Sequence, residues 1–523
     1  MSTPVDRLRE WARRSRHRLD TLELAPQIEH IGRVVRVGDG IAVVRGLPAT
    51  RLDELLLFDN GVRGLAVDLG EEEIGCVLLG ETGTIAADSL VKGTAEVVRV
   101  PVGDALLGRV VDALGLPLDD REPPEPADHW PVERPAPAIV DRALVTRPLT
   151  TGLLVVDAMI PLGRGQRELI IGDRGTGKTA VAVDAILSQR SSDVLCIYAA
   201  IGQKASSVVR VIDAVRRHGD AARCLFVVGN ADAAPGLQWL TPYAACAMGE
   251  YFMSRGHDVL LVIDDLTKHA AAYRQVSLLL RRPPGREAYP GDIFYIHSRL
   301  LERSAKLSPE RGGGSLTALP IAETQAGNIS AYIPTNLISI TDGQIYLDPR
   351  LFYEDLKPAV DVGKSVSRVG GKTQAVALRS LAENLRLEYA QFLELEVFTR
   401  FGTMVDARTR SIIEHGRRIR AVLGQPQLAP LTLGLQIALL CALGDRVLDS
   451  LTIEQVASFR LRLEPWLEAH SPPILSLDER MPPLTDDERL RLKEVLTRLA
   501  DDIRAAQATP TPSAPPASAS EAT

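Results

Sequence analysis

The sequence contains few aromatic residues and few cysteines, and it has no long apolar run. Aromatic residues make up 4% of the 523 residues, and the cysteines number five. An odd number of cysteines, most of them within apolar runs, indicates buried thiols in a reducing compartment rather than a disulfide framework. The thiols are Cys76, Cys196, Cys224, Cys246 and Cys441.

Several functional classes are disfavoured by these absences. No apolar stretch reaches the roughly 18 residues of a membrane-spanning helix, so no transmembrane segment is expected. The N-terminus is basic but lacks an apolar core, so no secretory signal is expected either. The formal net charge of −7 gives no general attraction to nucleic acid or membrane. The nine histidines lack metal-ligand spacing, so we expect them at surface or packing positions.

The composition is sufficient for several folded domains. Hydrophobic residues make up 45% of the chain, and the length suggests about three domains. Residues 31–100 consist of short β-rich runs separated by turn sequences, which predicts a small β-barrel. The predicted strands are 31–37, 41–44, 55–58, 64–69, 74–79 and 96–100. Prolines among charged residues in 117–137 predict an irregular connection.

The middle of the chain alternates apolar strands with helical patterns. This interleaving predicts a parallel sheet with helices on both faces. The predicted strands are 169–171, 194–199, 224–228, 259–263 and, last, 337–340. From about residue 373 the pattern becomes helical, with helices expected over 375–398, 398–423 and 435–448. The end of the chain is rich in Pro, Ser and Ala and is expected to be disordered.

One stretch in the middle carries the strongest functional signal. Residues 172–179 fit G-x-x-x-x-G-K-[ST], the phosphate-binding loop, between a predicted strand and a predicted helix. Backbone N–H groups and the positive end of the helix dipole would face the phosphates. Lys178 would reach the β- and γ-phosphates, and the Thr179 hydroxyl would ligate Mg²⁺. A chance match is the alternative, which the flanking strand and helix disfavour. The loop residues are Gly172, Asp173, Arg174, Gly175, Thr176, Gly177, Lys178 and Thr179.

Two polar residues are expected at the carboxyl edge of the same sheet. Asp264 ends a hydrophobic strand, where phosphate-loop enzymes hold the Mg²⁺-bound water network; a helix cap is the alternative. Gln203 follows another strand. Hydrolysis favours a carboxylate there to polarise water, and Gln cannot accept a proton. We therefore expect ATP binding with poor hydrolysis, the alternative being that Gln203 positions water as a glutamine does in some GTPases.

Arg368 lies in a Ser/Gly-rich stretch after the last predicted strand. Such an arginine could stabilise phosphoryl transfer in a neighbouring subunit, as an arginine finger does. A structural salt bridge is the alternative.

The N-terminal segment is strongly basic. Residues 5–22 predict a helix with six arginines and an irregular apolar stripe. Three roles are possible for this helix: a solvated charged face, docking on an acidic partner helix, or binding at a membrane surface.

Together these residues resemble the α subunit of F-type ATP synthase, from about Ile31 to Asp449. The resemblance rests on four stretches besides the phosphate loop: 101–115, 160–174, 272–292 and 338–344. Gln203 is similar to α, since the catalytic β subunit carries Glu at that place. The resemblance implies an N-terminal β-barrel, a central α/β RecA-like P-loop domain and a C-terminal α-helical bundle. The expected boundaries are 1–26 for the basic helix, 27–95, 96–372 and 373–502 for the three domains, and 503–523 for a disordered tail.

The resemblance also implies a set of functional residues. Arg368 would reach the β subunit's catalytic site, with Ser365 in the same functional loop, and both are therefore catalytic candidates. Thr179 and Asp264 would hold Mg²⁺, and ATP or ADP would occupy a non-catalytic site. The adenine pocket of that site would contain Phe352, Pro358, Gln425 and Gln427.

The implied assembly is a proton- or sodium-transporting two-sector ATPase. Three α and three β chains would alternate around a γ shaft, with δ or its equivalent on the N-terminal helix and no nucleic acid bound. The complex would lie peripherally on the cytoplasmic face of the bacterial inner membrane. Some features depart from the family: Gly175 replaces a usual Gln, Lys357 replaces an adenine-stacking Arg, and the N-terminal helix is diverged. These departures suggest a divergent bacterial version, with a sodium-pumping complex as one option.

Two other functions are alternatives for this sequence. A self-sufficient catalytic ATPase of the secretion or flagellar export type would need Glu at position 203. An RNA-translocating hexamer would need basic and aromatic residues on its barrel, whereas residues 51–82 are net acidic.

Overall fold

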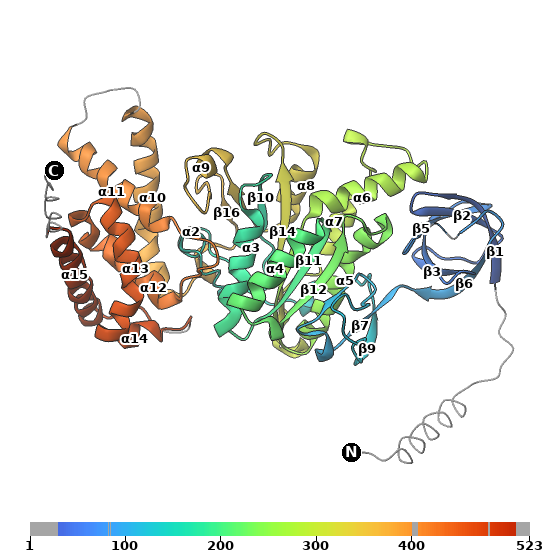
Figure 1. Cartoon of the computed structure of the whole chain (residues 1–523), viewed down its shortest axis with the longest axis horizontal. Helices are drawn as coiled ribbons and strands as arrows, with labels where there is room; N and C mark the ends of the chain where they lie inside the picture. Colours follow the sequence, from blue (N-terminus) through green and yellow to red (C-terminus); the bar gives the residue numbers. More distant parts are fainter. Residues whose placement is uncertain (1–29, 82, 84, 400–405, 480–481, 509–523) are drawn as a thin grey trace, which may run out of the picture.

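The computed structural model describes residues 30–81, 83, 85–399, 406–479 and 482–508. A β-barrel, a sheet domain and a helical domain follow one another along the long axis of the molecule (Figure 1). This arrangement confirms the predicted fold class. The basic helix predicted over residues 5–22 lies outside the described residues.

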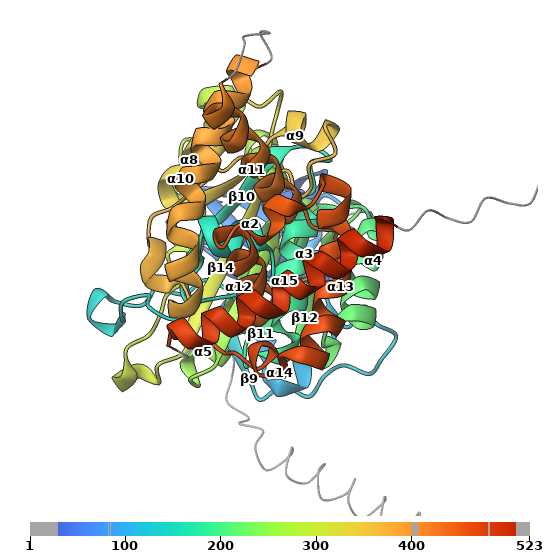
Figure 2. The ribbon, with the colours of Figure 1, turned by 90° about the vertical axis from the view of Figure 1, so that its left-hand side faces the viewer.

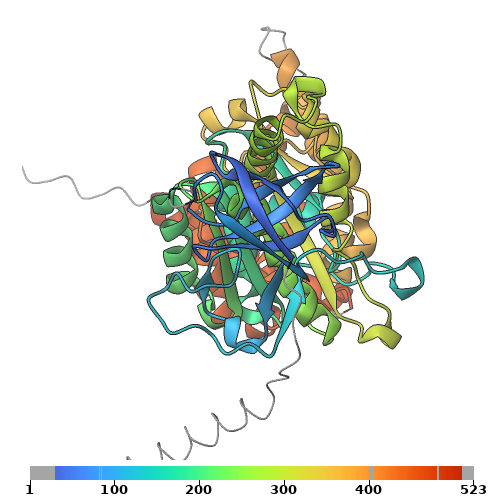
Figure 3. The ribbon, with the colours of Figure 1, turned by 90° about the vertical axis from the view of Figure 1, so that its right-hand side faces the viewer.

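The barrel is closed, with its strands in the order β1-β2-β5-β4-β3-β6. Viewed from that end in Figure 3, its strands cross in front of the sheet domain. Its apolar side chains form a separate small core that includes Val34, Leu56, Phe58 and Cys76. The strands are β1 (His30–Gly38), β2 (Ile41–Arg45), β3 (Glu54–Phe58), β4 (Arg63–Leu69), β5 (Glu73–Leu78) and β6 (Leu90–Val97).

The predicted strand over 96–100 is wrong. Two strands share this run: β6 closes the barrel, and β7 (Arg99–Val102) pairs with β9 (Asp128–Pro131) outside it. The valine-rich sequence continues through the point where the chain leaves the barrel, so composition marks no break there. β9 also lies within the connection predicted as irregular.

The central sheet has the order β16-β15-β10-β14-β13-β11-β12-β8. The pairings from β15 to β8 are parallel, and β16 is antiparallel to β15. Helices α3 and α4 cover one face and α5 and α6 the other, each face with its own apolar cluster (Figure 1). The strands are β8 (Val110–Val111), β10 (Leu169–Asp173), β11 (Leu195–Gln203), β12 (Cys224–Asn230), β13 (Asp258–Asp264), β14 (Ser315–Thr324), β15 (Gly343–Leu347) and β16 (Val366–Ser367). The helices are α2 (Leu154–Met159), α3 (Lys178–Ser188), α4 (Ala205–His218), α5 (Pro235–Ser254), α6 (Leu266–Leu279), α7 (Ile293–Leu301), α8 (Tyr332–Ile340) and α9 (Pro349–Tyr353).

The predicted strand over 337–340 is also wrong, and β14 was missed. Residues 337–340 form the last turn of α8, in which Ile333, Leu337 and Ile340 are buried at helical spacing. When an apolar run is this short, periodicity alone cannot distinguish a buried turn of helix from a buried strand. The real strand, β15, begins at Gly343.

The C-terminal domain is helical, as predicted. Helix α12 is buried on nearly all sides, and the other helices surround it. Helix α15 continues to Ala508, so residues 503–508 are helical, although they were predicted as part of the disordered tail. Ile503 is buried in the apolar core and helps to hold the start of this segment in place. The helices are α10 (Val376–Thr399), α11 (Ala407–Leu423), α12 (Leu433–Gly444), α13 (Ile453–His470), α14 (Pro472–Leu475) and α15 (Asp486–Ala508).

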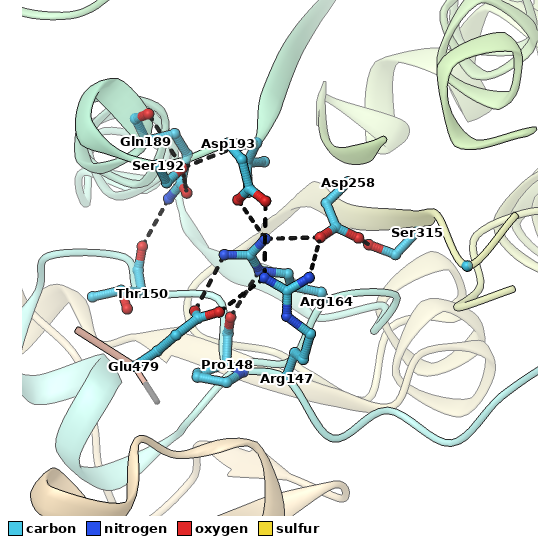
Figure 4. A network of polar contacts seen from close by, with 12 residues as sticks. Arg147, Pro148, Thr150, Arg164, Gln189, Ser192, Asp193, Asp258, Ser315 and Glu479 are labelled. Atoms are coloured by element: carbon cyan, nitrogen blue, oxygen red, sulfur yellow. Dashed lines mark hydrogen bonds and ion pairs between the residues drawn. The ribbon is translucent and has the colours of Figure 1, made fainter. Parts of the chain in front are cut away.

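An ion-pair network ties the helical domain to the sheet domain (Figure 4). The buried Arg164 guanidinium contacts Asp193 at 2.6 Å, Asp258 at 2.7 Å and Glu479 at 3.2 Å. Arg147 pairs with Glu479 as well, at 2.9 Å. Glu479 follows α14, so its two ion pairs fix that segment against the edge of the sheet domain. Breaking a buried pair of this kind leaves an uncompensated charge, which is costly.

Candidate functional site

The predicted phosphate loop connects β10 to α3. β10 lies between β14 and β15 in the interior of the sheet, so the strand is held on both sides. Gly175 and Gly177 adopt positive φ values of 82° and 95°, a region that favours glycine. A Cβ at either position would meet nothing within 4 Å, so open space lies over the loop. This geometry is that of a backbone cradle with room for a phosphate.

Lys178, the first residue of α3, lies over this loop. Its buried ammonium donates hydrogen bonds to the carbonyl oxygens of Gly172 at 3.0 Å and Asp173 at 2.7 Å. The Glu323 carboxylate lies 4.0 Å away. Burial lowers the pKa of Lys178, and the nearby carboxylates, Glu323 first, oppose that shift. The cation is thus held where it could meet an anion on the loop.

The Asp173 and Arg174 side chains do not enter the cradle. The Asp173 carboxylate accepts hydrogen bonds from the Thr324 hydroxyl at 2.5 Å and the Gly327 N–H at 2.9 Å, and so braces the segment after β14. Arg174 is exposed. The Thr176 hydroxyl donates to the Asp173 carbonyl at 2.8 Å and tightens the loop.

Asp264 joins the loop to two other strands. Its Oδ2 accepts hydrogen bonds from the Thr179 hydroxyl at 2.7 Å and the Tyr198 hydroxyl at 2.8 Å. Its Oδ1 accepts from Gln203 Nε2 at 2.7 Å, and Gln203 Oε1 in turn accepts from Lys268 Nζ at 2.7 Å. Both amide atoms of Gln203 are therefore engaged. The sequence pattern gave no signal for Tyr198 and Lys268, because neither lies at a strand end.

The neighbouring Asp265, not Asp264, caps helix α6. Its carboxylate accepts from the Lys268 N–H at 2.7 Å. Burial, and then the charge of Asp264, raise the pKa of Asp265 to about 7. Helix capping, the alternative role considered for Asp264, is therefore performed by Asp265. Asp264 and Thr179 present the oxygen ligands that Mg²⁺ prefers, so this donor set fits the expected ion.

Arg368 lies at the edge of the sheet, directly after β16. Its exposed guanidinium donates to the carbonyls of Thr341 at 3.1 Å and Ile338 at 3.2 Å, at the C-terminal end of α8. A cation is favoured at that end of a helix dipole. Helix α8 packs its buried side chains into the apolar cluster of one face of the sheet, whereas α3 packs into the cluster of the other face; the two helices are labelled in Figure 2. No carboxylate salt bridge to Arg368 occurs within the described residues.

Ser365 is buried beneath this edge. Its hydroxyl donates to the Asp361 carbonyl at 2.7 Å and accepts from the Tyr346 N–H at 2.9 Å. The hydroxyl thus fastens the loop before Arg368 to β15. Its catalytic assignment stays a prediction, and its contacts are those of a residue that positions the loop.

Two loops bring the predicted adenine-pocket residues near one another. The Gln425 N–H donates to the Lys357 carbonyl at 2.7 Å, next to Pro358. The Lys357 ammonium lies 4.9 Å from the centre of the Phe352 ring. Lys357 and Gln425 also line a cavity of about 570 Å³ together with Arg417, Arg420 and Arg460, among others.

The two glutamines of this region differ. The Gln425 side chain is buried, and its Nε2 donates to the Gly152 and Ala429 carbonyls, both at 2.8 Å. Its Oε1 accepts from the Leu154 N–H at 3.2 Å. Gln427 is exposed and free of such internal bonds among those described. Gln427 is therefore the better placed of the two to meet a ligand, and Gln425 supports the loop.

Asp184, which sequence analysis missed, connects this loop to the phosphate-loop helix. Its Oδ1 accepts from the Leu428 N–H at 2.7 Å across 244 residues of chain. Burial raises the pKa of Asp184 to about 6, and the Leu428 hydrogen bond opposes the shift. Because the raised value exceeds the ordinary one of roughly 4, the folded state binds more protons between pH 4 and 6.

We expect Asp184→Asn to stabilise the chain near neutral pH. In the parent chain this group makes the free energy of unfolding fall as pH rises from about 4 to 6. Asn keeps an acceptor for Leu428 and removes the buried charge, so the variant should lose that slope and gain on the order of 2 kcal/mol at pH 7. Thermal unfolding at several pH values measures the effect. Asp213→Asn, on the exposed side of α4, is the control; equal slopes for all three proteins would contradict the assignment.

A closed barrel, a phosphate loop on a parallel sheet and a helical domain define a three-domain P-loop nucleotide-binding protein. Comparison with known families agrees with that class. Three models match: "ATP synthase alpha/beta family, beta-barrel domain" over residues 27–95, "nucleotide-binding domain" over 152–367 and "C terminal domain" over 374–499.

Curated relatives narrow the assignment. ATP synthase subunit alpha 3 of Paraburkholderia xenovorans is 54% identical over 520 residues, which covers 99% of this chain and 98% of the relative. ATP synthase subunit alpha 2 of Gluconobacter oxydans is 54% identical over 497 residues (95% and 98%). That of Burkholderia thailandensis is 58% identical over 463 residues (88% and 83%). The chain belongs to the family of F-type ATP synthase alpha subunits, which bind nucleotide and work as part of an ATPase complex.

Membership in this family implies partner chains such as the β and γ subunits. Among the described residues, no helix is both long and apolar enough to cross a bilayer.

Proposed function

We propose that this chain is the non-catalytic, regulatory ATP-binding subunit of a rotary synthase. It grips Mg²⁺–ATP on its own phosphate loop without hydrolysing it and supplies Arg368 to the catalytic site of the neighbouring β subunit. The first part of the proposal, ATP binding without hydrolysis, rests on the contacts of Gln203. Its amide is hydrogen-bonded to Asp264 and Lys268, at the position where hydrolysis would need a carboxylate.

The residues of the loop would divide the work of binding. Lys178 and the backbone N–H groups of residues 174–179 would hold the β- and γ-phosphates. Thr179 and Asp264 would hold Mg²⁺, which neutralises phosphate charge when bound. Phe352, Pro358 and Gln427 would contact the adenine, and Lys357 would take the place of an arginine beside it.

The second part of the proposal, that Arg368 acts in the catalytic site of the neighbouring β subunit, rests on the exposure of Arg368. Its guanidinium is exposed and held by carbonyls at the end of α8, and among the described residues it forms no ion pair with a carboxylate, although its charge opposes the rise that burial causes in the pKa of Glu168. A guanidinium fixed in this way suits a phosphoryl group supplied by another chain, because it needs little reorganisation. Buried Ser365 would hold its loop in place.

The larger assembly follows from the family. We propose an alternating α₃β₃ ring around γ, with δ or an equivalent stalk subunit on the N-terminal helix. The ring would drive, or be driven by, proton or sodium translocation at the cytoplasmic face of a bacterial inner membrane.

The purified chain, incubated with Mg²⁺–ATP, tests the proposal. We expect saturable ATP binding by calorimetry and turnover below about 10⁻² s⁻¹, since the typical kcat of a dedicated phosphoryl-transfer enzyme is about 1–100 s⁻¹. Turnover within that range by the isolated chain would reject the proposal in favour of a self-sufficient ATPase. The coupled β subunit assayed alone and in the reconstituted ring is the positive control.

A further inference from the structure

A short segment of the sheet domain presents large aliphatic side chains to solvent. Ile139, Val140 and Leu144 are 90%, 86% and 85% exposed. Single exposed aliphatic residues are common, but three of them within one short segment favour burial of that segment against a partner. We call residues 139–144 the apolar arm. It projects in teal from the right of Figure 3 and from the left of Figure 2.

The backbone of the apolar arm is held in place. The Ala143 N–H donates to the Lys306 carbonyl and the Ser308 N–H to the Asp141 carbonyl, both at 2.8 Å. The Arg311 guanidinium donates to the Asp141 carboxylate at 2.7 Å. The exposed aliphatic side chains therefore sit on an anchored segment, which lowers the entropy lost when a partner covers them.

A chain of polar contacts links the arm to Arg368. The Arg142 guanidinium, within the arm, donates to the Glu302 carbonyl at 2.8 Å and pairs with its carboxylate at 3.3 Å. Glu302 pairs with Arg167, whose Nε donates to the Asp342 carboxylate at 3.0 Å. The Asp342 carbonyl accepts from the Arg368 N–H at 2.8 Å.

These contacts join the apolar arm to the backbone of Arg368, whose side chain lies at the C-terminal end of α8, and Figure 2 shows the arm and α8 both to the left of the sheet domain. If Arg368 meets a neighbouring chain, the surface that continues from it faces the same chain. We infer that the apolar arm docks into an apolar depression on the β subunit that receives Arg368. The inference rests on the proposed ring. It adds a second, apolar contact to the interface that would contain the catalytic site. Through Arg142, Glu302, Arg167 and Asp342, the docked arm would also fix the backbone that carries Arg368.

Hydrogen exchange of the assembled ring tests this surface directly. The amide hydrogens of Ile139, Val140 and Leu144 should exchange at least tenfold more slowly in the reconstituted ring than in the isolated chain. Exchange is read without turnover, so the result stands whether or not Arg368 acts in catalysis. Equal exchange in the two states overturns the inference. Protection already present in the isolated chain overturns it too, because another part of this chain or a second copy would then cover the arm.

A double variant, Ile139→Ser with Val140→Ser, gives the second test. We expect unchanged thermal unfolding and ATP binding in the isolated chain, and at least tenfold weaker assembly with β and γ measured by native mass spectrometry. Leu461→Ser is the matched control, because Leu461 is 82% exposed on α13 in the helical domain; it should assemble as the parent does. Parent-like assembly of the double variant overturns the inference. The two proposals can be separated by their results. If both tests support docking of the arm but Arg368→Ala leaves turnover normal, the arm is an interface and only the proposed role of Arg368 is rejected.

Discussion

Arg368→Ala is expected to reduce ATP hydrolysis and synthesis by the assembled complex about 10³-fold or more. An arginine finger supplied by a neighbouring subunit contributes factors of this size, since it neutralises charge that develops only in the transition state. ATP binding to this chain should not change, because the Arg368 guanidinium contacts the end of α8, and α8 packs on the opposite face of the sheet from the phosphate-loop helix α3. The measurement is steady-state ATPase activity of reconstituted rings, together with calorimetric ATP binding to the isolated variant.

The controls separate chemistry from folding and assembly. Loss of the bonds to the α8 carbonyls should cost only about 1 kcal/mol of stability, so rings should still form. Arg217→Ala removes an equally charged side chain that is 76% exposed on α4 and should leave activity within twofold. Arg368→Lys keeps the charge without the planar fork and should recover part of the loss. Activity of intact Arg368→Ala rings within a few-fold of the parent would remove Arg368 from the mechanism.

Lys178→Ala is expected to weaken ATP binding to the isolated chain about 100-fold or more. Truncating one partner of a desolvated charge pair typically costs 2–5 kcal/mol, much of it from the charge left behind. In the assembled ring, turnover should fall but remain detectable, because the proposed function places the catalytic phosphates on the neighbouring chain. Calorimetry with Mg²⁺–ATP measures the first effect, and ring ATPase activity measures the second.

A matched lysine controls for charge in this experiment. Lys372 is exposed beyond β16, and Lys372→Ala should bind ATP as the parent does. Burial already lowers the pKa of Lys178, so its removal should not lower the thermal midpoint of the nucleotide-free chain. Parent-like affinity of Lys178→Ala would show that the loop does not hold the nucleotide, and complete loss of turnover in intact rings would show that this site itself is catalytic.

Local sequence determined the phosphate loop and the fold class. The loop is contiguous, and its glycines, lysine and threonine act through their own backbone and through the helix that follows, so a linear pattern suffices to find it. Alternation of apolar strands and helices likewise fixes the layered arrangement of the middle domain. Asp264 was found because it ends an apolar strand, the place where a parallel sheet presents its ligands. The barrel was found from its turn signals, apart from the strand that closes it.

Tertiary structure alone decided how those residues are used. The Thr179–Asp264 contact joins residues 85 apart, and the Asp184–Leu428 contact joins residues 244 apart. No periodicity records such partners, because hydrogen bonds across a fold depend on strand order and not on spacing along the chain. The same holds for the burial of Gln425, the outward position of Arg368 and the polar contacts that join it to the apolar arm. Sequence therefore specified which chemical groups this subunit carries, and the packing of the sheet specified which of them gather at the phosphate loop and which lie exposed at the end of α8.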